Sequence, residues 1–538
     1  MPVNKKPNQE RDTAEQLKAL GNEFYQKGRY EDAYKTYSDA IKKDPNNAVL
    51  YANRAATYAA CDARKATEID PTYAKAWARL GTAMHALSSW KRCIPVWERA
   101  LACLPPDESM SATDRRLKVQ LEEGLKKSQD AIDNVQAPPV VQLTTGPDDV
   151  DKVPWKRALV KEQQLLPLNK LSSSFAILNA YRDFSDGVEH MKQIQRNPSG
   201  GGFLWFGRTD AIASISNGIL RDQRVFHVDS DDWFDKYNLQ VEFEANEVKA
   251  WIGSGPKMVK EEAIKRLKRE GWQSVRHALA LTVRAWIMRA FMEKSAGNHI
   301  VGSDFYRHAL DVLEWGRQTW PNVPKAERGV IFELSFVRTV KKLCLGAMHQ
   351  RLCHRDADCV FTKEDLAELA RELVFETDAN PPVPGDPLDA GGYLSFWHHP
   401  KGEAFSILGW YHMEAAFRSD EDGDKYHHFT ESASYYIQAA EMYPEDDEYY
   451  PYYLKIALEA YWLRGAPLRD SLALCKRIRI AIPKMLVFWE VSQMAEERDK
   501  SLKEALDWEV EQQRALVEDT KTLDSVVKII DRVLRSPV

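Results

Sequence analysis

The sequence AEQLKALGNEFYQKGRYEDAYKTYSDAIKKDPNNA, residues 14–48, reads as two helices joined by a tight turn. Leu17, Gly21 and Phe24 recur at helical spacing in its first half. Tyr37 and Ile41 do so in its second half. A glycine separates the two halves and a proline follows them, and both residues end helices. This stretch therefore predicts a helical hairpin.

A second hairpin of the same kind follows in AWARLGTAMHALSSWKRCIPVWERALACLPP, residues 76–106. Leu80, Gly81 and Ala83 line its first half, and Trp97 and Ala100 line its second. Small residues suit the places where two helices approach closely, and large ones fill the neighbouring gap. Both hairpins resemble the tetratricopeptide repeat, a unit of about 34 residues.

The hairpin between these two copies is short. Gly81 lies 60 residues after Gly21, whereas two repeats of about 34 would place it roughly 68 residues on, so about eight residues are missing. They are missing from YANRAATYAACDARKATEIDPTYAK, residues 51–75, before Asp62. Either the hairpin is truncated, or the sequence represents a spliced or mispredicted form. The sequence leaves both explanations open.

Five polar residues recur on the first helices of the three hairpins. Lys18 and Asn22 are four residues apart and share one helix face, as do Lys75 and Arg79, and Asn53 lies on the first helix of the middle hairpin. In a stacked array of hairpins the first helices line the concave surface. Three cations and two amides on one concave surface suit an acidic chain end, because charge-assisted hydrogen bonds are the strong ones.

The same five residues resemble the carboxylate clamp of tetratricopeptide co-chaperones, which include the Hsp-organising and the small glutamine-rich tetratricopeptide proteins. LKALGN contains Lys18 and Asn22, YANRAATY contains Asn53, and YAKAWARLG contains Lys75 and Arg79. The resemblance implies that these side chains hold the C-terminal Glu-Glu-Val-Asp of heat-shock protein 70 or 90.

This resemblance covers residues 12–135 only. The remainder, from Trp155 onward, is predicted to be mostly helical, with hairpins such as 275–294 with 305–319 and 403–417 with 429–443. Between residues 197 and 256 the runs GGGFLWFG and RVFHVDSDDWF are compatible with loops or with a small strand pair.

The fold class expected from these patterns is all-α: a solenoid of helical hairpins followed by a larger, partly repeat-like helical domain. The expected boundaries are a disordered tail at 1–11, the repeat domain with its capping helix at 12–136, a linker at 137–153, a helical domain at 154–490 and C-terminal helices at 491–538.

Composition narrows the classes of partner. The 538 residues carry a net charge of -6, which argues against a general nucleic-acid or membrane footprint. The first residues lack the apolar core of a signal peptide. Seven cysteines without a CxxC pair indicate unpaired thiols in a reducing compartment. We expect a cytoplasmic protein, and the nucleus is left open as a second location.

No cofactor or metal is expected. Cys344, His349, Cys353, His354 and Cys359 lie close together in sequence, but the tight cysteine pairs typical of structural zinc are missing. No combination of nucleophile, base and orienting group is visible, so an enzyme is not expected.

The predicted function is a non-catalytic adaptor or co-chaperone that binds the chaperone tail and uses its C-terminal domain for an unknown second protein. Two alternatives remain: a repeat scaffold for unrelated partners, and an enzyme whose site lies in the C-terminal domain.

Overall fold

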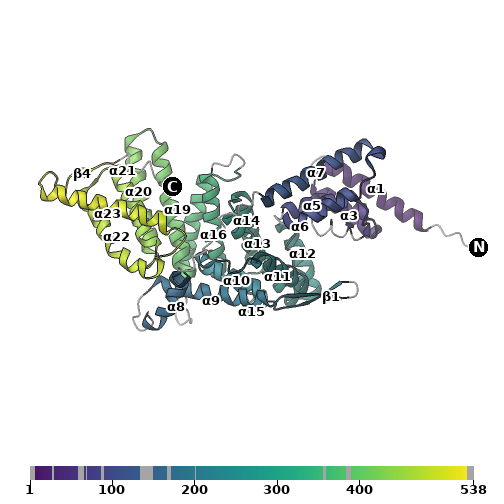
Figure 1. The fold of residues 1–538 in the computed structure, drawn as a ribbon, viewed down its shortest axis with the longest axis horizontal. Coiled ribbons are helices and arrows are strands. Elements are labelled where there is room, and N and C mark those ends of the chain that lie inside the picture. Colours follow the sequence, from purple (N-terminus) through teal and green to yellow (C-terminus); the bar gives the residue numbers. More distant parts are fainter. Residues whose placement is uncertain are drawn as a thin grey trace, which may run out of the picture. The chain divides into compact units, whose positions relative to one another are not determined.

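The computed structural model of the chain is built almost entirely of helices (Figure 1). It describes residues 6–26, 30–58, 63, 66–67, 69–86, 90–133, 150–165, 171–199, 202–354, 359–382 and 389–529. The chain divides into two compact units, one of residues 1–139 with 253–259 and the other of residues 140–252 with 260–538. Each unit is described by itself below.

The first unit is a series of antiparallel helices. They are α1 (Lys6–Gln26), α2 (Tyr30–Lys43), α3 (Ala48–Tyr58), α5 (Ala74–Ala86), α6 (Trp90–Ala102), the 3₁₀ turn η1 (Asp107–Ser109) and α7 (Ala112–Asp133). Helices α1 with α2 and α5 with α6 form the two predicted hairpins, and α7 packs on α6 as the expected capping helix. Helix α1 begins at Lys6, inside the stretch 1–11 that we expected to be a disordered tail.

Glycine allows the helices of each hairpin to approach closely. A Cβ atom on Gly21 would lie 2.5 Å from the ring of Tyr37, and one on Gly81 would lie 2.7 Å from the ring of Trp97. Glycine also allows the capping helix to approach closely, because a Cβ on Gly124 would lie 2.8 Å from Trp97. These distances are too short for any side chain, so the aromatic rings pack directly on helix backbone.

The middle hairpin is assembled from alanines. Residues 63, 66, 67 and 69 are helical after α3, and residues 59–62, where the sequence predicts the shortening, lie outside the described residues. Ala66 is fully buried and packs with Ala48, Ala52 and Ala76 in one cluster. Small side chains let this short segment fit between its neighbours, and α3 and α5 still lie against each other.

The second unit begins after the predicted linker, of which residues 137–149 lie outside the described part. Its helices, including short 3₁₀ and π turns, are η2 (Val150–Lys152), α8 (Pro154–Leu165), α9 (Ser173–Lys192), α10 (Ala211–Arg221), η4 (Gln223–Val225), α11 (Trp233–Val248), α12 (Pro256–Glu270), α13 (Trp272–Ser295), α14 (His299–Thr319), α15 (Lys325–Arg328), η5 (Val330–Phe332), α16 (Leu334–Cys353), α17 (Lys363–Ala379), α18 (Ala390–Tyr393), η6 (Leu394–His398), α19 (His399–Arg418), α20 (Asp422–Glu441), α21 (Tyr449–Arg464), α22 (Leu468–Trp489) and α23 (Ala495–Val517).

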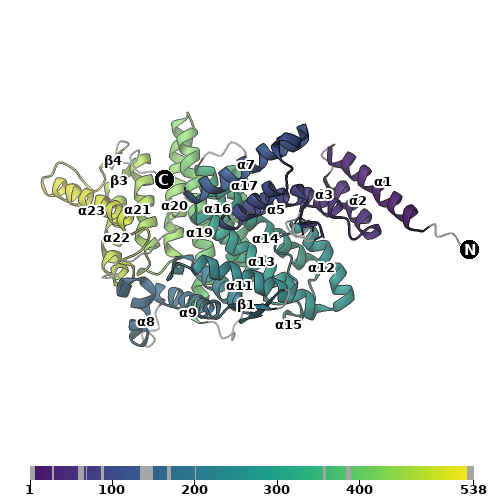
Figure 2. The same ribbon diagram turned by 45° about the vertical axis from the view of Figure 1, so that its right-hand side comes forward.

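Several of these helices pair as hairpins in the way the sequence indicated. Helices α13 and α14 pack together, as do α19 and α20, and the series continues through α20, α21, α22 and α23 (Figure 2). Glycine again faces an aromatic ring, because a Cβ on Gly409 of α19 would lie 2.8 Å from Tyr436 of α20. The all-α fold class is therefore confirmed.

Strand is a minor component of the described residues. Strand β1 (Gln195–Ser199) pairs antiparallel with β2 (Gly202–Phe206), and β3 (Ala466–Pro467) pairs with β4 (Val526–Val527). The FLWF run therefore forms a strand, whereas RVFHVDSDDWF leads through η4 into α11. Among the helices of the described residues, none is both long enough and apolar enough to cross a bilayer.

The tight approach of α5 to α6 gives a first prediction. Replacing Gly81 with alanine places a methyl group against Trp97 and should lower the free energy of unfolding by about 1–3 kcal/mol through overpacking. Urea denaturation of the full chain measures this change. The control is Gly423→Ala in α20, where the added Cβ has no neighbour within 4 Å apart from adjacent residues and its own helix backbone. Equal destabilisation by the two substitutions would show that the contact with Trp97 is unimportant.

Candidate functional site

A chain of hydrogen bonds joins the first helices of the three hairpins. The Asn22 Oδ1 atom on α1 accepts a 2.7 Å bond from the Tyr37 hydroxyl and a 3.0 Å bond from Nδ2 of Asn53 on α3. The Oδ1 atom of Asn53 accepts a 3.2 Å bond from the Arg79 guanidinium on α5. Three of the five predicted clamp residues are therefore linked by direct hydrogen bonds, Asn22 to Asn53 and Asn53 to Arg79.

The positions of these side chains follow from local packing. Asn22 comes directly after Gly21, whose backbone is pressed against Tyr37, and Arg79 comes directly before the buried Leu80. The polar side chains are half-buried, since they lie where helix faces meet. Hydrogen bonds in such places are stronger than in water because the surroundings are less polar.

The two predicted lysines lie outside this hydrogen-bonded chain. Lys18, one helical turn before Asn22, forms an ion pair with Glu15 on the same helix. Lys75, one turn before Arg79, is exposed and has no hydrogen-bond or ion-pair partner among the described residues. Their part in binding a carboxylate stays a prediction.

Two tyrosines belong to the surroundings of the site and were not singled out from the sequence as polar groups. Tyr37 was assigned to the hydrophobic face of its helix, yet its hydroxyl contacts Asn22. Tyr73 precedes α5, and burial raises the pKa of its phenol while the positive charge of nearby Arg79 acts to lower it. An aromatic residue with a hydroxyl at a core position is the sequence signal for such a contact.

The same unit also contains an acidic groove. It is open, has a volume of about 700 Å³, and is lined in part by Glu15, Asp44 and Asp70. Like charges repel, so a peptide carboxylate is disfavoured in this groove.

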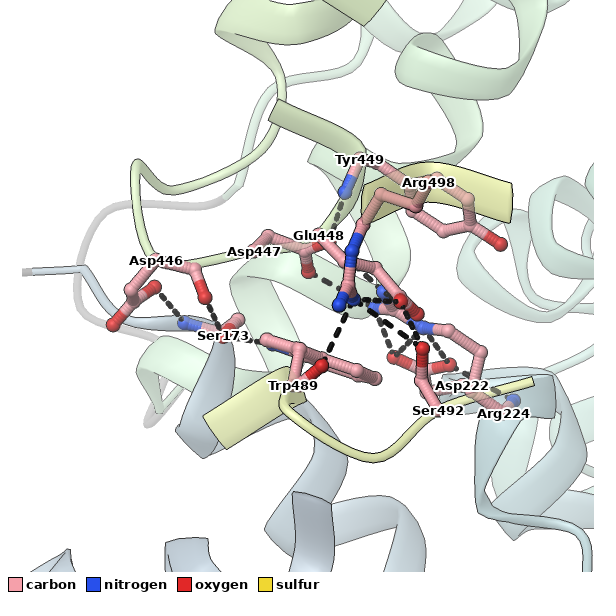
Figure 3. Close-up of polar contacts among 10 residues, drawn as sticks. All are labelled: Ser173, Asp222, Arg224, Asp446, Asp447, Glu448, Tyr449, Trp489, Ser492 and Arg498. Atoms are coloured by element: carbon pink, nitrogen blue, oxygen red, sulfur yellow. Dashed lines mark hydrogen bonds and ion pairs between the residues drawn. The ribbon is translucent and has the colours of Figure 1, made fainter. Parts of the chain in front are cut away.

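The second unit contains a buried ionic network that the sequence did not reveal (Figure 3). The Arg224 guanidinium donates to both carboxylate oxygens of Asp447, at 2.8 and 2.9 Å. It also donates to both oxygens of Asp222, at 2.9 and 2.7 Å. Its central carbon lies 3.8 Å from the centre of the Trp489 ring and 4.5 Å from that of Tyr449. One arginine thus ties η4 to the turn before α21 and to the end of α22.

A second arginine extends the network. Arg498 of α23 is fully buried and donates at 2.9 Å to Glu448 and at 2.9 Å to the Trp489 carbonyl oxygen. Ser492 also donates to Glu448. The Trp489 indole donates to the Ser173 hydroxyl at 2.9 Å.

Asp446 accepts hydrogen bonds from the start of α9 and so links this helix to the same region. The Ser173 backbone N–H donates to its carboxylate at 2.8 Å (Figure 3). The Ser172 hydroxyl donates to the same carboxylate at 2.6 Å. Residues from four separate parts of the sequence therefore meet at this network.

Burial and the arginine charges have opposite effects on the pKa values of the carboxyl groups in the network. Burial alone would raise the pKa of Asp222, but the charge and hydrogen bonds of Arg224 lower it to about 2. Burial raises the pKa of Glu448, although Arg224 and Arg498 oppose this shift. The nearby cavity, lined by Arg224, Glu448 and Trp489, has a volume of only about 100 Å³. It is too small for a peptide or an organic cofactor, so the network acts as a structural tie.

The predicted cluster of cysteines and histidines provides no metal centre among the described residues, where no three suitable side chains come together. The Cys353 sulfur lies 3.4 Å from Nε2 of His349, while Cys344 is buried in the core. His354 instead lies close to the ring of His299.

The network gives a second prediction. Because the folded pKa of Asp222 lies below its unfolded value of about 4, its contribution to stability is present above pH 4 and is lost as the pH falls towards 2. Asp222→Asn should lower the free energy of unfolding at pH 7 by about 3 kcal/mol and should weaken its pH dependence between pH 4 and pH 2.

Urea denaturation at several pH values measures both effects. The control is Asp311→Asn, which removes an exposed ion pair with Lys260 and should cost less than about 1 kcal/mol. If the two substitutions had equal effects, the network would have no special structural role.

Comparison with known proteins finds a family match for one segment of the chain and similarity to several proteins. Residues 21–60 match the family model for the TPR repeat, the tetratricopeptide repeat. The chain is 31% identical over 194 residues to the Hsp70-Hsp90 organizing protein of Triticum aestivum, which is 35% of this chain and 29% of that protein. It is 33% identical over 116 residues to the small glutamine-rich tetratricopeptide repeat-containing protein 2 of Mycosarcoma maydis, or 20% of this chain and 33% of that protein.

A third similar protein is named as a phosphatase. The chain is 32% identical over 115 residues to human serine/threonine-protein phosphatase 5, which is 20% of this chain and 22% of the phosphatase. The chain thus spans a third or less of the length of each of these relatives. It carries the TPR repeat at residues 21–60 and is similar, over about a third of its own length, to an Hsp70-Hsp90 organizing protein.

Proposed function

We propose that the N-terminal unit binds the C-terminal Glu-Glu-Val-Asp tail of heat-shock protein 70 or 90, and that the chain is a non-catalytic adaptor or co-chaperone. The observation that carries this proposal is the hydrogen-bonded series Asn22–Asn53–Arg79 across α1, α3 and α5. It brings two amides and one guanidinium, from three separate helices, within reach of one small acidic group.

The chemistry of these groups suits a chain terminus. A terminal aspartate presents two carboxylates, which only accept hydrogen bonds, and both need donors. Asparagine NH₂ groups and the guanidinium are donors, while Lys18 and Lys75 add positive charge one helical turn away. Lys75 is the more available of the two lysines, because Glu15 already pairs with Lys18. The similarity to Hsp70-Hsp90 organizing proteins agrees with this choice of partner.

In this proposal the second unit has a different role from the N-terminal unit. Its buried carboxylates Asp222, Asp447 and Glu448 are bound to arginines in a network that ties helices together. We assign it the binding of a second protein, the client or partner that the adaptor delivers to the chaperone. No cofactor is required for either role.

Free thiols support a proposal for the location. Cys93, Cys103, Cys344, Cys353, Cys359 and Cys475 are free, and Cys61 lies outside the described residues. Free thiols suit a reducing compartment, so we place the protein in the cytoplasm or the nucleus.

The alternative is a repeat scaffold that binds unrelated proteins. A pull-down with a chaperone lacking its last four residues separates the two roles, because a carboxylate clamp loses its ligand and a general scaffold does not.

Removal of a clamp cation gives the third prediction. Lys75→Ala or Arg79→Ala should weaken binding of a Glu-Glu-Val-Asp peptide by about 2 kcal/mol, which is roughly a 30-fold increase in Kd. Calorimetric titration of the full chain measures it. Lys42→Ala is the matched control, because Lys42 is an exposed lysine on α2, a second helix of the array. An unchanged Kd in both clamp variants would refute the clamp.

A further inference from the structure

Hydrogen bonds fix which side of the Asn22 amide carries the oxygen and which side carries the NH₂ group. Its oxygen has two acceptor positions, and the Tyr37 hydroxyl and Asn53 Nδ2 fill them at 2.7 and 3.0 Å. A flipped amide would place its NH₂ against the NH₂ of Asn53, which is itself a donor. The NH₂ group of Asn22 must therefore point away from Tyr37, on the opposite side of the amide.

Packing fixes the position of the hydroxyl that shares the Asn22 oxygen with Asn53. Tyr37 is only 2% exposed, and its ring lies so close to Gly21 that a Cβ there would be 2.5 Å from it. A ring held on helix backbone in this way does not change rotamer without disturbing the hairpin. The hydroxyl is thus held in place beside Asn22, and it donates to the Asn22 oxygen because the NH₂ of Asn53 already requires that oxygen on this side.

The third hairpin shows that the repeat does not require such a contact. Trp97 takes the corresponding place against Gly81, but its indole N–H donates at 3.1 Å to Ser128 of the capping helix. Thr82, which follows Gly81 as Asn22 follows Gly21, donates to the Ala78 carbonyl oxygen of its own helix. Packing alone therefore accounts for the aromatic ring, and the hydroxyl of Tyr37 needs a separate explanation.

We propose that Tyr37 is a positioning residue for peptide binding: together with Asn53, its hydroxyl holds the Asn22 amide so that NH₂, and not oxygen, faces the incoming carboxylate. This inference rests on the function proposed above. The orientation matters because a carboxylate has no proton to donate, so an amide oxygen facing it would repel it.

The test is a double-mutant cycle in the full chain. Tyr37→Phe keeps the ring against Gly21 and removes only the hydroxyl. It should increase the Kd for a Glu-Glu-Val-Asp peptide by about three- to tenfold, the effect of one lost hydrogen bond. In an Asn22→Ala background, the same substitution should change Kd no further, because the amide that it positions is absent.

Tyr51→Phe on α3 is the matched control, since the described residues offer no hydrogen-bond partner to the Tyr51 hydroxyl, and it should leave Kd unchanged. Thermal denaturation shows whether each variant is folded. The inference is overturned if Tyr37→Phe binds like the unmodified chain, or if it weakens binding equally with and without Asn22.

A second readout separates this inference from the proposed function. If the unmodified chain fails to bind the peptide, the proposed function is wrong. The NMR signals of the Asn22 side-chain amide in the free protein then decide the role of Tyr37. Tyr37→Phe should move them and Tyr51→Phe should not, whereas signals unmoved by Tyr37→Phe would show that the hydroxyl does not position the amide.

Discussion

The hydrogen bond from Asn53 to Asn22 joins the first helices of two different hairpins, and the candidate site depends on it. It also links the guanidinium of Arg79 to α1, because Arg79 donates to Asn53. Each bond contributes only about 1 kcal/mol to stability. Their larger effect is geometric, because they fix which atoms of each amide are free to meet a ligand.

Close helix approach at glycine makes this geometry possible. Gly21 and Gly81 bring the backbones of their hairpins against Tyr37 and Trp97, so the first helices are set at a constant distance from the second ones. The shortened middle hairpin keeps the spacing with small residues such as Ala52 and Ala66. The loss of about eight residues therefore does not separate α3 from α5, and Asn53 still reaches Arg79.

Periodicity was sufficient to predict the hairpins, the capping helix and the all-α class, because each depends on residues close together in sequence. The roles of Asn22, Asn53, Arg79 and the two lysines came from resemblance and stay predictions. The buried network could not be found in this way. Arg224 and Asp447 are separated by 223 residues, and isolated charges in sequence usually indicate solvated surface. The hydroxyl of Tyr37 was missed for a related reason: a tyrosine at a core position indicates that its hydroxyl has a partner, but not which residue that partner is.

The central claim is that a free peptide carboxylate is what the N-terminal unit binds. Calorimetric titration of the full chain with a Glu-Glu-Val-Asp peptide, in its free-acid form and with its C-terminus amidated, tests it most directly. The account predicts that amidation, which removes the charge of the terminal carboxylate, increases Kd by about 10- to 100-fold. Equal affinity for the two peptides would contradict it.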